Sequence, residues 1–324
     1  MSPINSYKPE GMLITQPENR EYTATPAALE RAMQQGKILE GTVHLCDSRL
    51  ALHVDLGCME GIIPREEVLR CRREEELKDI AVITRVGKAV CFKVTGFVRE
   101  GGRMCALLSR RAAQEECARN YIAALRPGDI IPARVTHLEP FGAFVDIGCG
   151  ISSLLSVDCI SVSRIAHPRD RFSGGDFIPV VVKQIDRDRD RVFVTHRELL
   201  GTWEENACRF AVGQTVAGIL RSIENYGIFV ELTPNLAGLA ELRDDRLPSL
   251  DLSVGRSAAV YIKSIIPERM KIKLVLIDTY SGPRTPTPRK YYINPAETSH
   301  IDRWCYSPAG SPKVVETVFS GDEE

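Results

Sequence analysis

Apolar and polar residues alternate along three separate stretches of the chain, and each stretch follows a glycine. The stretches read GKILEGTVHLC from Gly36, GDIIPARVTHLE from Gly128 and GQTVAGILRSIE from Gly213. Alternation with a period of two is typical of a β-strand that buries one face. The pattern therefore predicts a strand at the same place in three related units.

The three units share further positions in the same order. Seventeen or eighteen residues after each first glycine come the triplets VDL, VDI and VEL, at 54–56, 145–147 and 230–232. A second glycine then precedes another apolar strand, and sixteen positions beyond it a basic residue opens the last strand. The glycine and basic residue of each unit are Gly87 and Arg103, Gly175 and Arg191, and Gly255 and Lys271. Such an internal repeat predicts three copies of one folding unit.

Each copy holds five short strands in about seventy residues, which predicts a small closed barrel of the OB type. We therefore expect an all-β fold of three tandem five-stranded OB barrels joined by short helices. The barrels are predicted at 36–111, 127–197 and 213–277, with helical linkers at 112–126 and 198–212. The N-terminal segment 1–35 is expected to be extended apart from a short helix at Pro26–Gln35. The Pro-rich tail 278–324 is expected to lack a core of its own, with Trp304 and Tyr306 packed on the third barrel.

Charge and composition narrow the class of protein. The formal net charge is −1 and 44% of residues are apolar, which predicts a globular protein that does not coat nucleic acid by bulk attraction. By copy the balance is +3, −1 and +1, so any polyanion must meet local patches. The ten cysteines form no CxxC pair and predict buried thiols in a reducing cytoplasm. A polar, Pro-interrupted start and the lack of a long apolar run disfavour secretion and membrane insertion.

The second copy carries a specific resemblance. Its sequences PGDIIPARVTHLEPFGAFVDIG and GDFIPVVVKQIDRDRDRVFVTHREL closely resemble the S-one (S1) family of RNA-binding domains. The third copy, with GQTVAGILRSIENYGIFVEL and NLAGLAEL, is similar, and the first is similar only in outline. The resemblance implies OB-type barrels, and the tandem array looks like a bacterial factor related to the largest protein of the small ribosomal subunit.

Aromatic residues mark the expected binding face. In the run PFGAFVDIG at 140–148, strand alternation points Phe144 and Asp146 outward, and an outward ring offers a surface on which a base can stack. The resemblance implies stacking aromatics at Phe141 and Phe144, with Gly142 leaving room for the base. The corresponding residues are Tyr226 and Phe229 in the third copy, and Leu50 and His53 in the first.

The last strand of each copy adds charge to the same face. Alternation points three residues of the second copy outward, Arg191, Phe193 and Thr195. Lys271 and Lys273 point outward in the third copy, and Arg103 provides the charge in the first. A cation beside an aromatic ring suits a phosphate and its base.

Two further observations bear on this face. The histidine with which the family usually ends strand three is replaced by Pro64, Ser156 and Glu241, and Glu241 is expected to repel phosphate. In the insert at 162–172, Arg164, Arg169 and Arg171 either extend a phosphate track or belong to a solvated loop.

Candidate catalytic and metal-binding residues are few. His196 faces inward by alternation, which favours a structural role, and His44 with Cys46 makes a poor zinc site. The sequence has no Gly-rich phosphate loop and no GxSxG motif, so we expect neither an enzyme nor a cofactor. The leading hypothesis is a cytoplasmic bacterial protein that binds single-stranded RNA, mainly messenger RNA, in association with the ribosome or translation. The alternative is an adaptor that docks on protein, either the ribosome or an RNA-decay complex, with little RNA affinity of its own.

Overall fold

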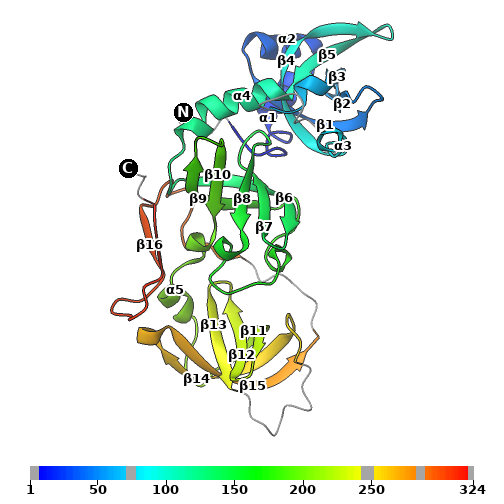
Figure 1. Ribbon diagram of the computed structural model, residues 1–324. Helices are drawn as coiled ribbons and strands as arrows, with labels where there is room; N and C mark the ends of the chain where they lie inside the picture. The colour runs from blue at the N-terminus through cyan, green and yellow to red at the C-terminus, as the bar shows by residue number, and fades with distance from the viewer. Residues whose placement is uncertain (1–6, 71–77, 242–251, 282–288, 320–324) are drawn as a thin grey trace. The chain divides into compact units, whose positions relative to one another are not determined.

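Three closed five-stranded barrels follow one another along the chain in a computed structural model (Figure 1). The structure describes residues 7–70, 78–241, 252–281 and 289–319. They divide into two compact units. Unit 1 is Met1–Leu125 with two short pieces of the second barrel, Pro132–Arg134 and Asp146–Ser152. Unit 2 holds the rest of the second barrel, the third barrel and the C-terminal segment.

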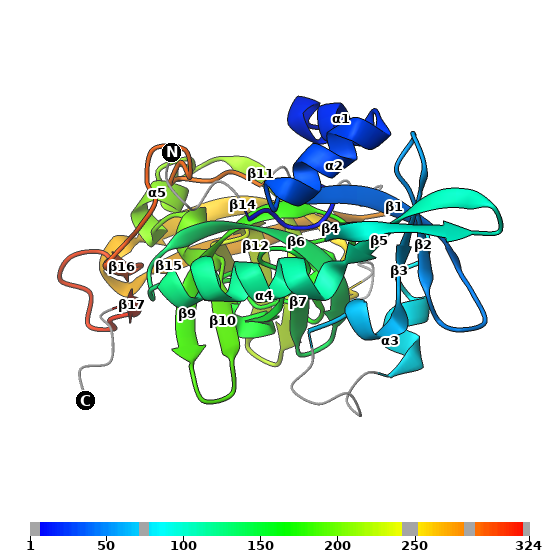
Figure 2. The ribbon, with the colours of Figure 1, turned by 90° about the horizontal axis from the view of Figure 1, so that it is seen from above.

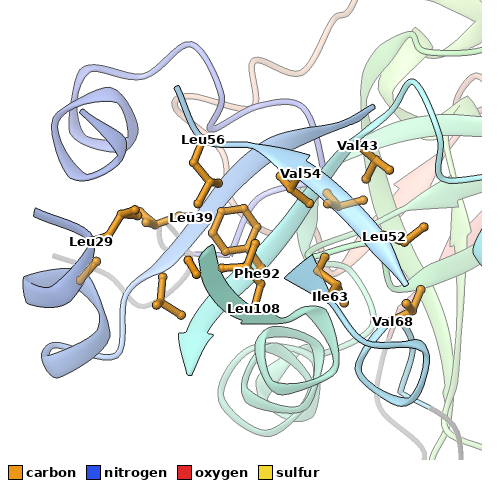
Figure 3. Close-up of a cluster of buried hydrophobic side chains, with 14 of the residues drawn as sticks. Leu29, Leu39, Val43, Leu52, Val54, Leu56, Ile63, Val68, Phe92 and Leu108 are labelled. Carbon is orange, nitrogen blue, oxygen red and sulfur yellow. The ribbon is translucent and has the colours of Figure 1, made fainter. Parts of the chain in front are cut away.

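The first barrel has the strand order β1-β2-β3-β5-β4, with β3 and β5 parallel and its other pairs antiparallel. Its strands are β1 Ile38–Cys46, β2 Leu52–Asp55, β3 Glu60–Ile63, β4 Ala89–Glu100 and β5 Arg103–Ser109. Inward residues from these strands form one apolar core, in which Leu39, Val54, Phe92 and Leu108 lie together (Figure 3). The helix residue Leu29 closes one side of this core.

The second and third barrels repeat this strand order, β6-β7-β8-β10-β9 and β11-β12-β13-β15-β14. In each, the third and fifth strands are again parallel. The second barrel has β6 Ile130–Glu139, β7 Gly142–Asp146, β8 Ser152–Ser156, β9 Phe177–Asp186 and β10 Arg191–Thr195. The third has β11 Thr215–Glu224, β12 Gly227–Thr233, β13 Leu236–Glu241, β14 Ser257–Ile266 and β15 Lys271–Tyr280. The predicted all-β class with three OB-type barrels is confirmed.

The repeated glycines and basic residues have the same structural place in each barrel. Arg103, Arg191 and Lys271 are the first residues of β5, β10 and β15, as predicted. The glycine before each fourth strand has a positive φ, which an L side chain rarely adopts. Its N–H donates to a carbonyl of the first strand in all three barrels. The pairs are Gly87 to Val43 at 2.8 Å, Gly175 to Val135 at 2.7 Å and Gly255 to Leu220 at 2.7 Å.

Helices precede the first barrel, lie between its third and fourth strands and lie between the barrels. The predicted N-terminal helix is α2, Pro26–Gln34, which begins after a Thr25 hydroxyl that accepts the N–H of Ala28. A second helix, α1 at Pro17–Thr23, was not predicted. Of these two helices, α1 lies beside β1 and α2 lies beside β4 (Figure 2). The remaining helices are α3 Asp79–Ile83, α4 Arg110–Asn120 and α5 Trp203–Ala207. Among the described residues, no helix is both long enough and apolar enough to cross a bilayer.

The C-terminal segment packs on both barrels of unit 2. Its short strands β16 Arg303–Cys305 and β17 Glu316–Val318 pair with each other, and Trp304 and Tyr306 are buried in the core cluster of the third barrel, as predicted. Phe319 is buried against Ile130 of the second barrel. Residues 282–288 and 320–324 of the predicted tail lie outside the described part of the chain.

Candidate nucleic-acid interface

Two pairs of aromatic rings have the same geometry in the second and third barrels. Phe141 and Phe144 have ring centroids 6.0 Å apart and planes at 88°, and Tyr226 and Phe229 have centroids 6.3 Å apart and planes at 89°. The first ring of each pair lies in the turn before β7 or β12 and is 56% exposed in Phe141 and 62% in Tyr226. The second ring is half-buried. Each pair therefore presents an open aromatic surface at the edge of its barrel.

A glycine between the two rings brings the strands close together. A Cβ atom at Gly142 would lie 2.5 Å from the carbonyl oxygen of Leu155, and one at Gly227 would lie 2.7 Å from that of Ala240. A side chain at either position would therefore push β7 from β8 or β12 from β13. This backbone contact gives the glycine a structural role that does not depend on an approaching base.

Strand register places a cation on the same face as the rings in the third barrel, two strands away from Phe229. Phe229 on β12 is opposite Leu239 on β13, which in turn is opposite Lys273 on β15. Residues that are directly opposite share one face of a sheet. Phe229 and Lys273 thus share one outward face, while Ile272 and Leu274 on either side of Lys273 are buried.

The second barrel has a ring in place of that lysine. Phe193 on β10 is opposite Leu154 on β8, and both are half-buried, while Val192 and Val194 are buried, as predicted. Arg191 is exposed at the start of the strand. β10 thus supplies the ring of Phe193 at its middle and the guanidinium of Arg191 at its first residue.

The prediction that Thr195 faces outward is wrong. Its side chain is fully buried, and its hydroxyl donates to Oε2 of Glu198 at 2.6 Å. Alternation ends here because the chain turns into a 3₁₀ helix at Arg197–Leu200 and covers the strand end.

Asp146 is also buried, contrary to the expectation that it points outward with Phe144. One carboxylate oxygen accepts the N–H groups of Gly148 at 2.8 Å and Gly150 at 2.9 Å. The other accepts the N–H of Glu10 at 2.7 Å. Burial and the charge of Glu10 raise the pKa of Asp146 to about 7. Asp146 therefore holds a loop and the N-terminal segment together within unit 1 and does not belong to the aromatic face.

The first barrel has two histidine rings in place of the Phe–Phe or Tyr–Phe pair: those of His44 and His53 have centroids 6.2 Å apart and planes at 66°. His53 is opposite Ile62 on β3, and Ile62 is opposite Leu107 on β5, so the same row of residues is mainly aliphatic. The ring of His53 lies 2.8 Å from a carboxylate oxygen of Glu60 and 3.6 Å from one of Asp47. Leu50 is only half-buried, and Arg103 is exposed. Two carboxylates beside His53 make this face unfavourable for phosphate.

Acidic and basic side chains are also paired on the third barrel. Glu241 lies 3.4 Å from the ammonium of Lys263 and 4.0 Å from that of Lys273. The charge of Lys273, a predicted binding residue, is therefore partly offset by Glu241, the carboxylate that was expected to repel phosphate. Lys271 at the start of β15 is exposed.

The insert before β9 contributes less charge than its sequence indicates. Arg164 and Arg169 are exposed, but the side chain of Arg171 is buried and donates to Glu231 of the third barrel at 2.6 Å. Arg221 donates to the same Glu231 oxygen at 2.7 Å. Arg171 is thus a structural residue between two barrels of unit 2 and does not extend a phosphate track.

His196 is structural, as predicted. It is buried, with Nδ1 3.0 Å from the carbonyl oxygen of Ile160 and Nε2 3.2 Å from the Tyr291 hydroxyl. Burial lowers its pKa to about 4. In the described residues, no group of three or more His, Cys, Asp or Glu side chains is arranged to hold a metal ion.

One residue of this face was not singled out from the sequence. The ring of His137 on β6 lies over Phe144, with centroids 6.5 Å apart and planes at 27°. Its Nε2 is 2.6 Å from Oε1 of Glu139. Aligning the three copies would have drawn attention to it. His137 follows Gly128 by nine residues, and at the same place after Gly36 and Gly213 stand Leu45 and Ser222, which have no ring.

Comparisons with known proteins match the second barrel and most of the chain. A family model described as the S1 RNA binding domain matches residues 124–197. The small ribosomal subunit protein bS1 of Mycolicibacterium smegmatis is 28% identical over 277 residues, which cover 82% of this chain and 56% of that protein. The bS1 protein of Staphylococcus aureus is 29% identical over 233 residues, covering 69% of this chain and 57% of that protein. The chain thus spans a little over half the length of these relatives.

Two solved structures match this chain at low similarity. One is a multidomain protein with nucleic acid binding domains from Streptococcus pneumoniae, at TM-score 0.23 and 15% identity, covering 75% of this chain and 73% of that one. The other is an a/eIF2alpha–aDim2p–rRNA complex from Pyrococcus horikoshii, at TM-score 0.23 and 17% identity, covering 23% and 46%.

Proposed function

We propose that this protein binds single-stranded RNA through its second and third barrels, because the middle barrel matches the family model described as the S1 RNA binding domain. One observation carries the proposal: the edge-to-face ring pairs Phe141–Phe144 and Tyr226–Phe229 recur with the same geometry in both barrels. Stacking on such rings is open to every base, because every base has a π-face. The proposed activity is binding without catalysis.

Barrel two is the stronger site in this proposal. It combines the ring pair with Phe193 on β10 and an exposed Arg191, whereas Lys273 in barrel three lies beside Glu241. Barrel one contributes little, because its row of residues is aliphatic and its histidine lies between carboxylates. Two linked sites of moderate strength suit a chain with a net charge of −1, since linkage raises affinity without additional charge.

The names of the relatives support a cellular setting. Two of them are named small ribosomal subunit protein bS1, and on this ground we propose that the protein acts in the bacterial cytoplasm, on the ribosome, with messenger RNA as its ligand. Fractionation of cell extracts on sucrose gradients tests this placement. Migration with the small subunit supports it, and migration as free protein at low salt contradicts it.

Anisotropy of a labelled oligouridine, titrated at several salt concentrations, tests RNA binding itself. We expect Phe141→Ala and Phe144→Ala each to weaken binding by about 1–3 kcal/mol, the usual value for one stacked base. Arg191→Ala should lower the slope of log affinity against log salt by about one phosphate contact. Phe177→Ala is the matched control, because Phe177 is an exposed phenylalanine of the same barrel, 49% exposed, at the far end of β9.

Two results would contradict the proposal. One is equal affinity of the parent and of both ring variants. The other is no measurable affinity for oligouridine together with capture of ribosomal proteins that survives RNase treatment. The second result would favour the alternative, an adaptor that docks on protein.

A further inference from the structure

His137 gives barrel two a third ring that the other barrels lack. Its ring is nearly parallel to that of Phe144, with planes at 27°, whereas Phe141 meets Phe144 at 88°. The side chain of His137 is 65% exposed, so its open face is reachable from solvent. The orientation of two rings decides how many ring faces one base can stack on. A base can stack on one face of a perpendicular pair, and between two parallel rings it can stack on both.

The centroid separation of the nearly parallel rings sets an upper limit on the gap between their planes. Unbonded carbon atoms make their best contact at about 3.5 Å, so a base stacked on both faces needs two rings about 7 Å apart. The centroids of His137 and Phe144 are 6.5 Å apart, so the rings must separate before a base can enter. The side chains of His137 and Glu139 are 65% and 39% exposed, so they can move together without breaking their contact and open the gap.

Glu139 fixes the tilt of the histidine ring. Its carboxylate oxygen lies 2.6 Å from Nε2 of His137, two residues away on the same strand. A ring with one nitrogen in a hydrogen bond loses less rotational freedom on binding than a free ring, so the arrangement is partly preorganised.

We infer that His137 and Phe144 form a slot that holds one nucleobase of single-stranded RNA between their rings. The inference rests on the proposed function and adds a residue and a nucleotide position to it. In barrel three the residue opposite Phe229 is Ser222, and in barrel one the residue opposite His53 is Leu45. Neither has an aromatic ring. In barrel one the ring of His44 lies near His53, with centroids 6.2 Å apart, but its plane meets that of His53 at 66°, so among the described residues barrel two alone has a nearly parallel pair at this place.

The experiment uses the full chain and an oligouridine that carries a single 2-aminopurine, whose fluorescence is quenched when it stacks. With the parent, the probe should be quenched on binding when it occupies the slot. His137→Ala should weaken binding roughly fivefold or more, the lower end of the range for one stacked base, and should restore probe fluorescence. His137→Phe should retain both affinity and quenching, because it keeps a ring at the position.

Ser222→His provides a test in the opposite direction. It adds a ring opposite Phe229 and should increase the affinity of barrel three when measured in a Phe144→Ala background. His137→Ala with unchanged affinity and unchanged quenching, while Phe144→Ala weakens binding, overturns the slot and leaves the proposed function intact. Unchanged affinity in Phe144→Ala overturns the slot, and unchanged affinity in both Phe144→Ala and Phe141→Ala overturns the proposed function as well.

Discussion

Replacing Glu241 by glutamine should strengthen RNA binding by barrel three. Glu241 is half-exposed at the end of β13, 3.4 Å from the ammonium of Lys263 and 4.0 Å from that of Lys273. When RNA binds, a phosphate must compete with this carboxylate for both ammonium groups. Glutamine has the same shape and removes the charge.

The magnitude follows from these distances and exposures. Two unit charges 4 Å apart in bulk water interact by about 1 kcal/mol. All three side chains are 48–49% exposed, so solvent screens them, and exposed ion pairs of this kind measure about 0.2–1 kcal/mol. We expect a gain of about 0.5–1 kcal/mol, roughly a two- to fivefold increase in affinity.

The salt dependence should change as well. Each cation freed for a phosphate steepens the slope of log affinity against log salt by about 0.7 for a single strand. Glu241→Gln should therefore steepen the slope by about 0.7 to 1.4, according to whether one or both lysines contact phosphate. Anisotropy titrations in a Phe144→Ala background isolate barrel three. Glu30→Gln, an exposed residue of α2, carries the same change in net charge elsewhere.

The reasoning is refuted if Glu241→Gln matches its parent in both affinity and slope. It is also refuted if Glu30→Gln produces the same gain, because net charge and not the local carboxylate would then be the cause.

Stability gives three further predictions. Arg110 is fully buried and donates Nε to Glu10 at 2.6 Å, so Arg110→Met should destabilise the protein by about 3–5 kcal/mol in urea denaturation, and adding Glu10→Gln should recover part of the loss. The pKa of His196 is lowered to about 4, so the unfolded chain binds a proton below pH 6.5 that the folded chain does not. Stability should fall by about 3 kcal/mol between pH 6.5 and 4, and His196→Gln should flatten that part of the profile. Glu40, whose pKa burial raises to about 7, acts with the opposite sign, so Glu40→Gln should steepen the fall between pH 7 and 4.5.

The fold was predictable because its signals are local and occur three times. A glycine with positive φ precedes each fourth strand, and Arg103, Arg191 and Lys271 each begin the last strand. A period of two cannot tell which element will later cover an outward residue. The errors fall at that point: Asp146 meets the N-terminal segment and Thr195 meets the helical turn that follows it.

The partners of charged side chains were harder to predict than the positions of the aromatic rings. A ring at Phe141 or Tyr226 is exposed because the turn before the strand holds it there, and the sequence around the glycine defines that turn. An arginine or lysine is long enough to reach a carboxylate on a distant strand. Arg171 reaches Glu231, sixty residues later, and Lys273 lies beside Glu241, and neither pairing follows from spacing along the chain.

The contact between barrels two and three bears on how two moderate sites act together. Arg171 and Arg221 both donate to Glu231, and Arg221 also donates to Asp170 at 2.9 Å, so a buried network of two cations and two anions joins the insert of one barrel to the other. Asn235 adds to it by accepting the N–H of Val162 at 2.9 Å. Sites joined by a flexible linker have an effective concentration set by linker length, whereas sites on one packed body have one set by fixed geometry. Under the proposed function, an RNA bound at the first ring pair would meet the second without the entropy cost of ordering a linker, which would raise the affinity of a nearly neutral chain.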